Sequence, residues 1–174
     1  MPPMPALSPL ESPLQVVLVS PQIPPNVGNA ARTCAVTGSR LHLVGPLGFS
    51  LDDRHLRRAG LDYWPDARPA VYRDWAEFEA RALAGPKVGR PFPERLHLFT
   101  ARAVRSVHQA SFSPGDFLVF GEEQLGLPPA LLAAFPEREV GIPLLPDKRS
   151  LNLAVAVGVG VYAALSSIER ARPG

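Results

Sequence analysis

Residues 142–165 read IPLLPDKRSLNLAVAVGVGVYAAL, and this stretch decides the fold. A polar turn at residues 146–150 leads into a long run of small apolar residues, which one early amide, Asn152, interrupts. Valine and glycine disfavour a helix, but the run is too long for an ordinary strand, so we expect a helix that starts at Leu151. A buried asparagine must be fully hydrogen-bonded. The turn and the head of the helix are therefore expected to face a tightly held polar ligand, which we interpret as a cofactor.

Outside this stretch, short apolar runs alternate with helical patterns. We expect strands at residues 15–20, 39–45, 70–72, 95–100, 116–120 and 139–143. We expect helices at residues 27–38, 49–62, 74–83 and 129–135. The prolines at 24 and 25 predict an extended loop, after which Asn26 caps the first helix and Gly38 ends it. Strands that alternate with helices predict an α/β fold, with a parallel sheet flanked by helices.

The composition fits one globular domain. The chain has 174 residues, of which 46% are hydrophobic, so residues 15–170 can form a single domain after a loose, proline-rich leader at residues 1–14. The net charge of +2 and the isoelectric point of about 9.0 permit a nucleic-acid partner without requiring one.

Several classes of protein are disfavoured by the same counts. The single cysteine, Cys34, excludes a disulfide framework, and the four histidines lack metal-ligand spacing, so we expect no metal and a reducing, cytoplasmic setting. The leader has no signal-peptide pattern. The interrupted apolar run after Leu151 predicts a buried or dimer-facing helix instead of a membrane span.

Three polar loops follow predicted strands at their carboxyl ends, where ligands gather in open α/β sheets. They are residues 26–32 (NVGNAAR), residues 121–126 (GEEQLG) and the stretch around Ser150 and Asn152. In the first loop, the helix N-terminus would offer N–H groups to a phosphate, with Arg32 as an anion clamp. Each loop taken alone also fits a simple capped or acidic helix start. Three of them in one small chain favour a shared site.

In order and spacing, these loops resemble the three motifs of the SPOUT superfamily of RNA 2′-O-methyltransferases. The matching residues are Asn26, Gly28 and Arg32, then Gly121, Glu123 and Gly126, and finally Ile142 to Leu144 with Ser150 to Ala154. The likeness is greatest to the small enzymes that methylate the wobble nucleotide of tRNA, through PQIPPNVGNAARTCAVTG, RLHLVGPLGF and LRRAGLDYW. The chain departs from that subgroup at Trp64, at Glu122, and at Ala154 and Val155, which replace a Ser-Asn pair.

The resemblance implies a deep trefoil knot at about residues 95–168, with S-adenosylmethionine bound in its crevice and S-adenosylhomocysteine as the product. It also implies a homodimer, no metal, and the tRNA anticodon stem-loop as substrate. Small residues along the last helix, from Ala154 to Ala163, are consistent with a close helix contact in that dimer. The residues implied to bind the cofactor are Phe99, Thr100, Gly121, Glu123, Ile142, Leu144, Ser150 and Leu151.

By the same resemblance, Arg32 is the main catalytic candidate. A guanidinium stays protonated, so we expect it to stabilise the developing alkoxide and grip the neighbouring phosphate instead of acting as a base. Asn26 and Asn152 would orient the ribose and Arg32.

The arginines Arg54, Arg57 and Arg58 are expected to contact the RNA backbone, although such a charge run is often only a solvated helix face. Two other functions stay open at this point. One is a ribosomal RNA 2′-O-methyltransferase, and the other is a knotted RNA-binding protein without catalysis, which only Ala154 and Val155 support.

Overall fold

The fold is built on one parallel sheet. The computed structural model describes residues 6–51, 63–67, 69–85 and 89–172, and within them lies a six-stranded sheet in the order β3-β2-β1-β5-β4-β6. Every neighbouring pair in this sheet is parallel. The strands are β1 (Gln15–Val19), β2 (Arg40–Val44), β3 (Ala70–Tyr72), β4 (Leu96–Phe99), β5 (Phe117–Phe120) and β6 (Glu139–Val140). The predicted strands and the α/β class are confirmed, with β6 shorter than expected.

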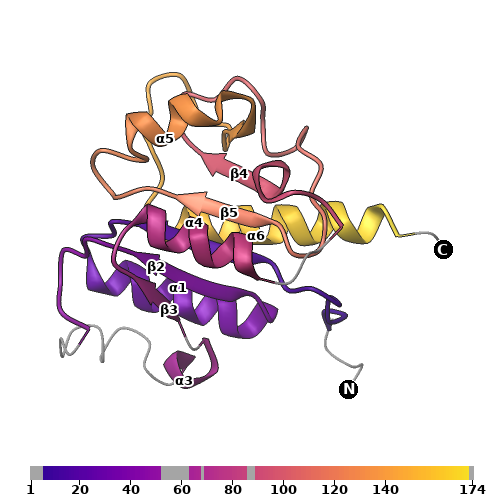
Figure 1. The fold of residues 1–174 in the computed structure, drawn as a ribbon. Helices are drawn as coiled ribbons and strands as arrows, with labels where there is room; N and C mark the ends of the chain where they lie inside the picture. The colour runs from indigo at the N-terminus through magenta and orange to yellow at the C-terminus, as the bar shows by residue number, and fades with distance from the viewer. Residues whose placement is uncertain (1–5, 52–62, 68, 86–88, 173–174) are drawn as a thin grey trace, which may run out of the picture.

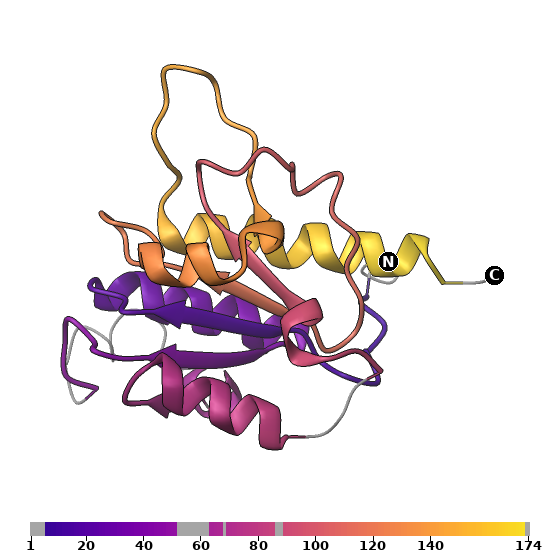
Figure 2. The same cartoon turned by 45° about the horizontal axis from the view of Figure 1, so that its top comes forward.

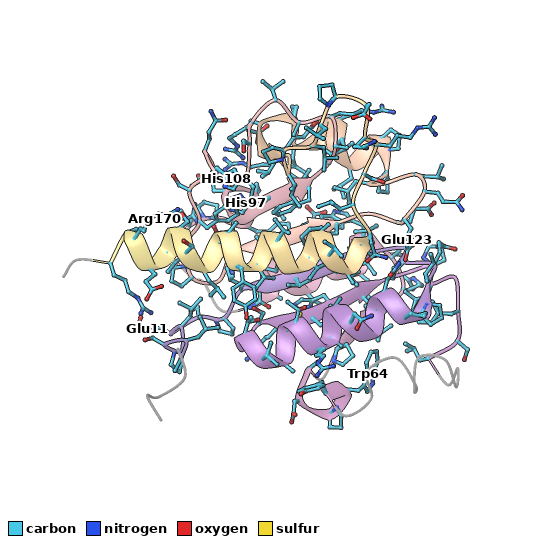
Figure 3. The ribbon with its side chains drawn as sticks, turned by 180° about the vertical axis from the view of Figure 1, so that it is seen from behind. Glu11, Trp64, His97, His108, Glu123 and Arg170 are labelled. Carbon is cyan, nitrogen blue, oxygen red and sulfur yellow. The ribbon has the colours of Figure 1, made fainter. Side chains whose placement is uncertain are left out.

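Helices cover both faces of the sheet. The described helices are α1 (Pro24–Thr37), α3 (Trp64–Ala67), α4 (Trp75–Ala84), α5 (Pro129–Ala134) and α6 (Leu153–Arg170), with short 3-10 turns η2 (Phe92–Arg95) and η3 (Pro136–Arg138). In Figure 1, α4 and α5 lie in front of the sheet, and Figure 3 shows α1 and α6 side by side on the opposite face. The predicted helix at residues 49–62 falls mainly on residues 52–62, which lie outside the described residues.

Because side chains alternate along a strand, the two faces of the sheet carry separate cores. One core joins Val16 and Leu18 of β1 to α1 and α6, and the other joins Val17 and Val19 to Phe78 of α4. Part of the predicted leader also belongs to the fold. Leu14 is buried and Leu10 packs against the first core, so this end of the leader is not loose.

The first helix begins earlier than the sequence predicts. Its N-cap is Ile23, and Pro24 and Pro25 form the first turn. Proline suits this turn because it has no N–H to leave unpaired and its φ is already helical. The prediction that Asn26 is the N-cap is therefore wrong. The predicted end is confirmed, because Gly38 adopts a φ of 67°, which favours glycine.

The predicted C-terminal helix is confirmed, and Asn152 caps its N-terminus. The Oδ1 atom of Asn152 accepts hydrogen bonds from the N–H groups of Ala154 at 2.9 Å and Val155 at 3.3 Å. It is exposed, so the prediction of a dry environment is wrong. By length and composition alone α6 could cross a membrane. The core helix of a soluble protein passes the same test, and α6 buries one face, which includes Leu153, against the sheet and α1.

Candidate functional site

One chain of hydrogen bonds joins the three loops that the sequence singles out. The Glu123 carboxylate accepts from the backbone N–H of Gln22 (2.9 Å) and of Ile23 (3.1 Å), and from Nδ2 of Asn26 (2.9 Å). The Oδ1 atom of Asn26 then accepts from Nδ2 of Asn152 at 2.9 Å. We call this chain the Glu123–Asn26–Asn152 relay. Figure 3 shows Glu123 where the first turns of α1 and α6 approach each other.

The relay has a fixed direction, and Glu123 sets it. A carboxylate can only accept hydrogen bonds, so the NH₂ group of Asn26 must face Glu123. Its oxygen then faces Asn152, which must turn its own NH₂ group toward Asn26. This leaves the oxygen of Asn152 free to cap α6. Asn26 is only 5% exposed, so the Asn26 amide is held inside the protein by partners on both sides.

The start of α1 is not a phosphate site. Pro24 and Pro25 have no N–H, and the N–H of Asn26 donates to the Ile23 carbonyl at 3.0 Å. The N–H groups of Gln22 and Ile23 already bind Glu123, whose negative charge suits a helix N-terminus. A phosphate there would meet a carboxylate with no free donor, so this sequence prediction is wrong.

Arg32 lies outside the relay, on the exposed side of α1. Its Cζ atom lies 4.8 Å from the centre of the Tyr63 ring, within the range of a cation–π contact. Among the described residues, no side chain takes a hydrogen bond from Arg32. Sequence analysis missed Tyr63, although it belongs to the LRRAGLDYW stretch that carries the resemblance. Arg54, Arg57 and Arg58, which precede Tyr63 in the sequence, lie outside the described residues.

A cavity of about 400 Å³ opens between the loops that follow β4 and β6. Figure 2 shows both loops rising from the same edge of the sheet. Ile142, Leu144 and Leu145 contribute to its apolar lining, and Lys148 and Arg149 also line it. Its volume lies within the range of small-molecule and cofactor sites. Of the predicted cofactor residues, Ile142 and Leu144 line this cavity.

The remaining predicted cofactor residues do not line it. Thr100, Ser150 and Leu151 lie on the same loops, and the backbone N–H of Thr100 is already bonded to the Val140 carbonyl at 3.0 Å. The Phe99 side chain is buried and stacks on Phe120, with ring centres 4.4 Å apart. It could therefore meet a ligand only through its backbone.

Gly121 is required by its own loop. A Cβ atom at this position would lie 2.0 Å from the Gly126 carbonyl carbon and 2.1 Å from the Leu127 nitrogen. The close approach at Gly121 is therefore made by the backbone of its own loop. The turn from Glu122 to Gly126 closes with two backbone hydrogen bonds of 3.2 and 3.0 Å, and it presents Glu123 to α1.

His97 and Cys34 are buried, and His42 is half-buried with a hydrogen-bond partner on each ring nitrogen. Gln15 donates to the Pro13 carbonyl, so its oxygen accepts from Nε2 of His42, whose Nδ1 in turn accepts from the Tyr72 hydroxyl. Burial, with a smaller contribution from the charge of nearby Arg40, lowers the pKa of His42 to about 4. Burial raises the pKa of Cys34 to about 12, so this thiol is no nucleophile at neutral pH.

The other strand histidine, His97, bonds Asp116 at 2.8 Å. In the part of the chain that the structure describes, no group of three or more histidine, cysteine, aspartate or glutamate residues could hold a metal ion.

The parallel sheet with helices on both faces defines an α/β architecture. The chain belongs to the SpoU rRNA methylase family, whose sequence model matches residues 13–162. Over 150 residues the chain is 51% identical to the tRNA (cytidine(34)-2'-O)-methyltransferase of Burkholderia pseudomallei, covering 86% of this chain and 92% of that one.

Solved structures agree with this family. A structure described as giving insights into the 2-OH methylation of C/U34 on tRNA superimposes with a TM-score of 0.80 at 43% identity, covering 90% of this chain and 96% of that one. The SpoU methyltransferase AviRb of Streptomyces viridochromogenes, solved in complex with the cofactor AdoMet, shares the fold with a TM-score of 0.73 at 24% identity. That match covers 92% of this chain and 59% of AviRb.

Proposed function

We propose that this chain transfers a methyl group from S-adenosylmethionine to the ribose 2′-hydroxyl of the wobble nucleotide, cytidine or uridine 34, of tRNA. The observation that carries the proposal is the 51% identity to the Burkholderia enzyme across 92% of its length. The family model matches residues 13–162, which contain all three motif loops, and the relay that joins them is intact.

The cavity after β4 and β6 fits a nucleoside-sized cofactor. Its apolar lining includes Ile142 and Leu144, and its volume of about 400 Å³ is sufficient for such a ligand. When bound, S-adenosylmethionine supplies a methyl group on a sulfonium. Within the cavity the cofactor would contact Ile142 and Leu144, and outside it the backbone of residues 99–100, 121 and 150–151. Glu123 contributes by holding its loop against α1 through the Gln22 and Ile23 N–H groups.

Arg32 is the group that meets the reacting ribose. Its guanidinium stays protonated, so it stabilises the hydroxyl oxygen as negative charge develops there and holds the adjoining phosphate. The proton leaves to that phosphate or to water. Asn26 acts indirectly, because its amide is already hydrogen-bonded to Glu123 and to Asn152. Its part is to hold Asn152 in place. Asn152, which is exposed, is the member of the relay that can reach the ribose.

A deep trefoil knot at about residues 95–168 accompanies this function. Support comes from the path of the chain after the edge strand β6. Gly141 exchanges hydrogen bonds with the loop after β4, donating to Arg105 at 2.9 Å and accepting from Val107 at 2.8 Å. The chain then returns to α6, which packs against β5 and α1 on one face of the sheet. The end of the chain thus passes the β4 loop before it reaches its place in the core.

The working form is a homodimer in the cytoplasm, with α6 at the interface. One side of α6 exposes Val155 (51%), Val159 (37%) and Tyr162 (51%), which recur at helical spacing. This stripe is the better candidate for the contact than the small residues that we expected. Gly160, one of those residues, faces the core, where a Cβ atom would lie 3.0 Å from the rings of Phe99 and Phe120.

The test uses purified protein, labelled S-adenosylmethionine, and tRNA and ribosomal RNA from a strain without wobble 2′-O-methylation. Mass mapping of the products is expected to place the label at nucleotide 34, and to separate cytidine from uridine targets. Label in ribosomal RNA alone would indicate a ribosomal RNA 2′-O-methyltransferase. Cofactor and RNA binding without transfer would indicate a non-catalytic protein.

Two further measurements test the partners. Activity should fall as salt rises if Arg54, Arg57 and Arg58 contact phosphates. Sedimentation should give a dimer.

A further inference from the structure

We propose that Tyr63 is a positioning residue, whose ring holds the Arg32 guanidinium with its N–H groups directed toward the substrate. The proposal rests on the proposed function, because it assigns Tyr63 a part in methyl transfer to RNA. Tyr63 acts only through Arg32, whose Cζ atom lies 4.8 Å from the centre of the Tyr63 ring. It touches neither of the reacting atoms.

The fold fixes the Tyr63 ring relative to α1. Tyr63 directly precedes α3, and α3 packs against α1. Trp64 packs on the core that α1 shares, and Ala67 is buried at 6% exposure. Figure 3 shows Trp64 beside α1. Residues on two elements of the same core thus hold the aromatic ring at a set place along the helix that carries Arg32.

A ring and a carboxylate would hold an arginine in different ways. Other exposed arginines here pair with carboxylates, such as Arg73 with Asp74 at 2.9 Å and Arg81 with Glu77 at 2.7 Å. A carboxylate occupies the N–H donors of the guanidinium and cancels its charge. An aromatic ring attracts the cation through its face and takes none of the donors that lie in the guanidinium plane.

Methyl transfer needs those donors and that charge. The 2′-oxygen forms a bond to the methyl carbon as the carbon–sulfur bond breaks, and the proton leaves to phosphate or water. Arg32 must already be oriented when this happens, since a long and exposed side chain would otherwise lose many rotamers on meeting the substrate. Tyr63 therefore reduces this cost before RNA binds, and its loss should lower kcat more than cofactor affinity.

The test compares Tyr63→Leu, which removes the ring, with Tyr63→Phe, which keeps it. We expect Tyr63→Leu to lower kcat about two- to fivefold, the factor that corresponds to a cation–π contact at an exposed site. Affinity for S-adenosylmethionine by calorimetry and the melting temperature should be unchanged. Tyr63→Phe should restore kcat. Arg81→Gln, which removes an arginine over the Tyr72 ring, is the matched control and should leave kcat unchanged.

A second measurement needs no activity. In NMR spectra of the free protein, the Arg32 side-chain protons should show an upfield ring-current shift that Tyr63→Phe keeps and Tyr63→Leu removes. If wild-type protein methylates no RNA, the proposed function fails, and this shift still decides whether Tyr63 holds Arg32.

Three results would overturn the proposal. One is an unchanged kcat in Tyr63→Leu. Another is an equal loss of kcat in Tyr63→Phe, which would show that the Tyr63 hydroxyl, and not its ring, is responsible. The last is the absence of any ring-current shift on Arg32.

Discussion

Replacing Glu123 by glutamine tests whether a carboxylate sets the direction of the Glu123–Asn26–Asn152 relay. Glu123→Gln keeps the size of the side chain but replaces one acceptor oxygen with an NH₂ group. If that group takes the place of Oε2, it points at the N–H of Gln22. If it takes the place of Oε1, it points at the N–H of Ile23 and at Nδ2 of Asn26. In either orientation at least one donor loses its acceptor.

The expected loss of stability follows from the lost negative charge of Glu123 and from the N–H donors left without an acceptor. A hydrogen bond to a charged group contributes about 1.5–3 kcal/mol, so we expect Glu123→Gln to lower the free energy of unfolding by about 2–3 kcal/mol. In a chain of this size, that corresponds to a fall of roughly 5–10 °C in melting temperature. In the second orientation the Asn26 amide must also turn over, which removes the partner of Asn152.

Urea unfolding and calorimetry would measure the loss. The matched control is Glu122→Gln, because it removes the neighbouring carboxylate from the same turn and leaves the relay complete. Equal unfolding free energies for the two variants, within about 0.5 kcal/mol, would show that the carboxylate at 123 does not organise the site.

Three other predictions concern the site and the core. Arg32→Ala should abolish methyl transfer and leave S-adenosylmethionine affinity nearly intact; lost affinity in calorimetry would remove Arg32 from the catalytic role. The pKa of His42 is lowered to about 4 in the folded state, so only the unfolded chain takes up this proton as pH falls from about 6.5 toward 4. Wild-type stability should therefore fall over that range by up to about 2–3 kcal/mol more than that of His42→Gln, and parallel pH profiles would contradict this. Gly160→Ala should destabilise by about 1–3 kcal/mol, because its Cβ would lie 3.0 Å from two aromatic rings. Gly158→Ala, which meets no atom within 4 Å, should be neutral or stabilising, and thermal unfolding compares the two.

The sequence predicted the architecture well because hydrophobic periodicity carries it. Every expected strand is present, and Gly38 ends α1 as its freedom to adopt positive φ suggests. The start of α1 was misplaced for a physical reason. Pro24 and Pro25 are equally compatible with an extended loop and with the first turn of a helix, and only the rest of the fold decides between them.

The site was predicted as a set of loops, and its internal chemistry was not. That Glu123 occupies the start of α1 depends on contacts between residues about one hundred positions apart, which no local pattern encodes. Asn152 carried a usable signal, since an asparagine just before an apolar run often caps a helix. Tyr63 carried only its place in the LRRAGLDYW stretch, because an aromatic side chain at this position is equally typical of core packing.

The span of the relay along the chain has a consequence for biosynthesis. Asn26 and Asn152 are 126 positions apart, and β5, which presents Glu123, pairs with β1 from the beginning of the chain. A ribosome must therefore translate nearly all of this sequence before the three loops can close on one another. The amino-terminal part leaves the ribosome early, before Glu123 and Asn152, the two partners of the Asn26 amide, have been translated. Capacity for methyl transfer would thus be acquired at the last stage of folding, when α6 docks.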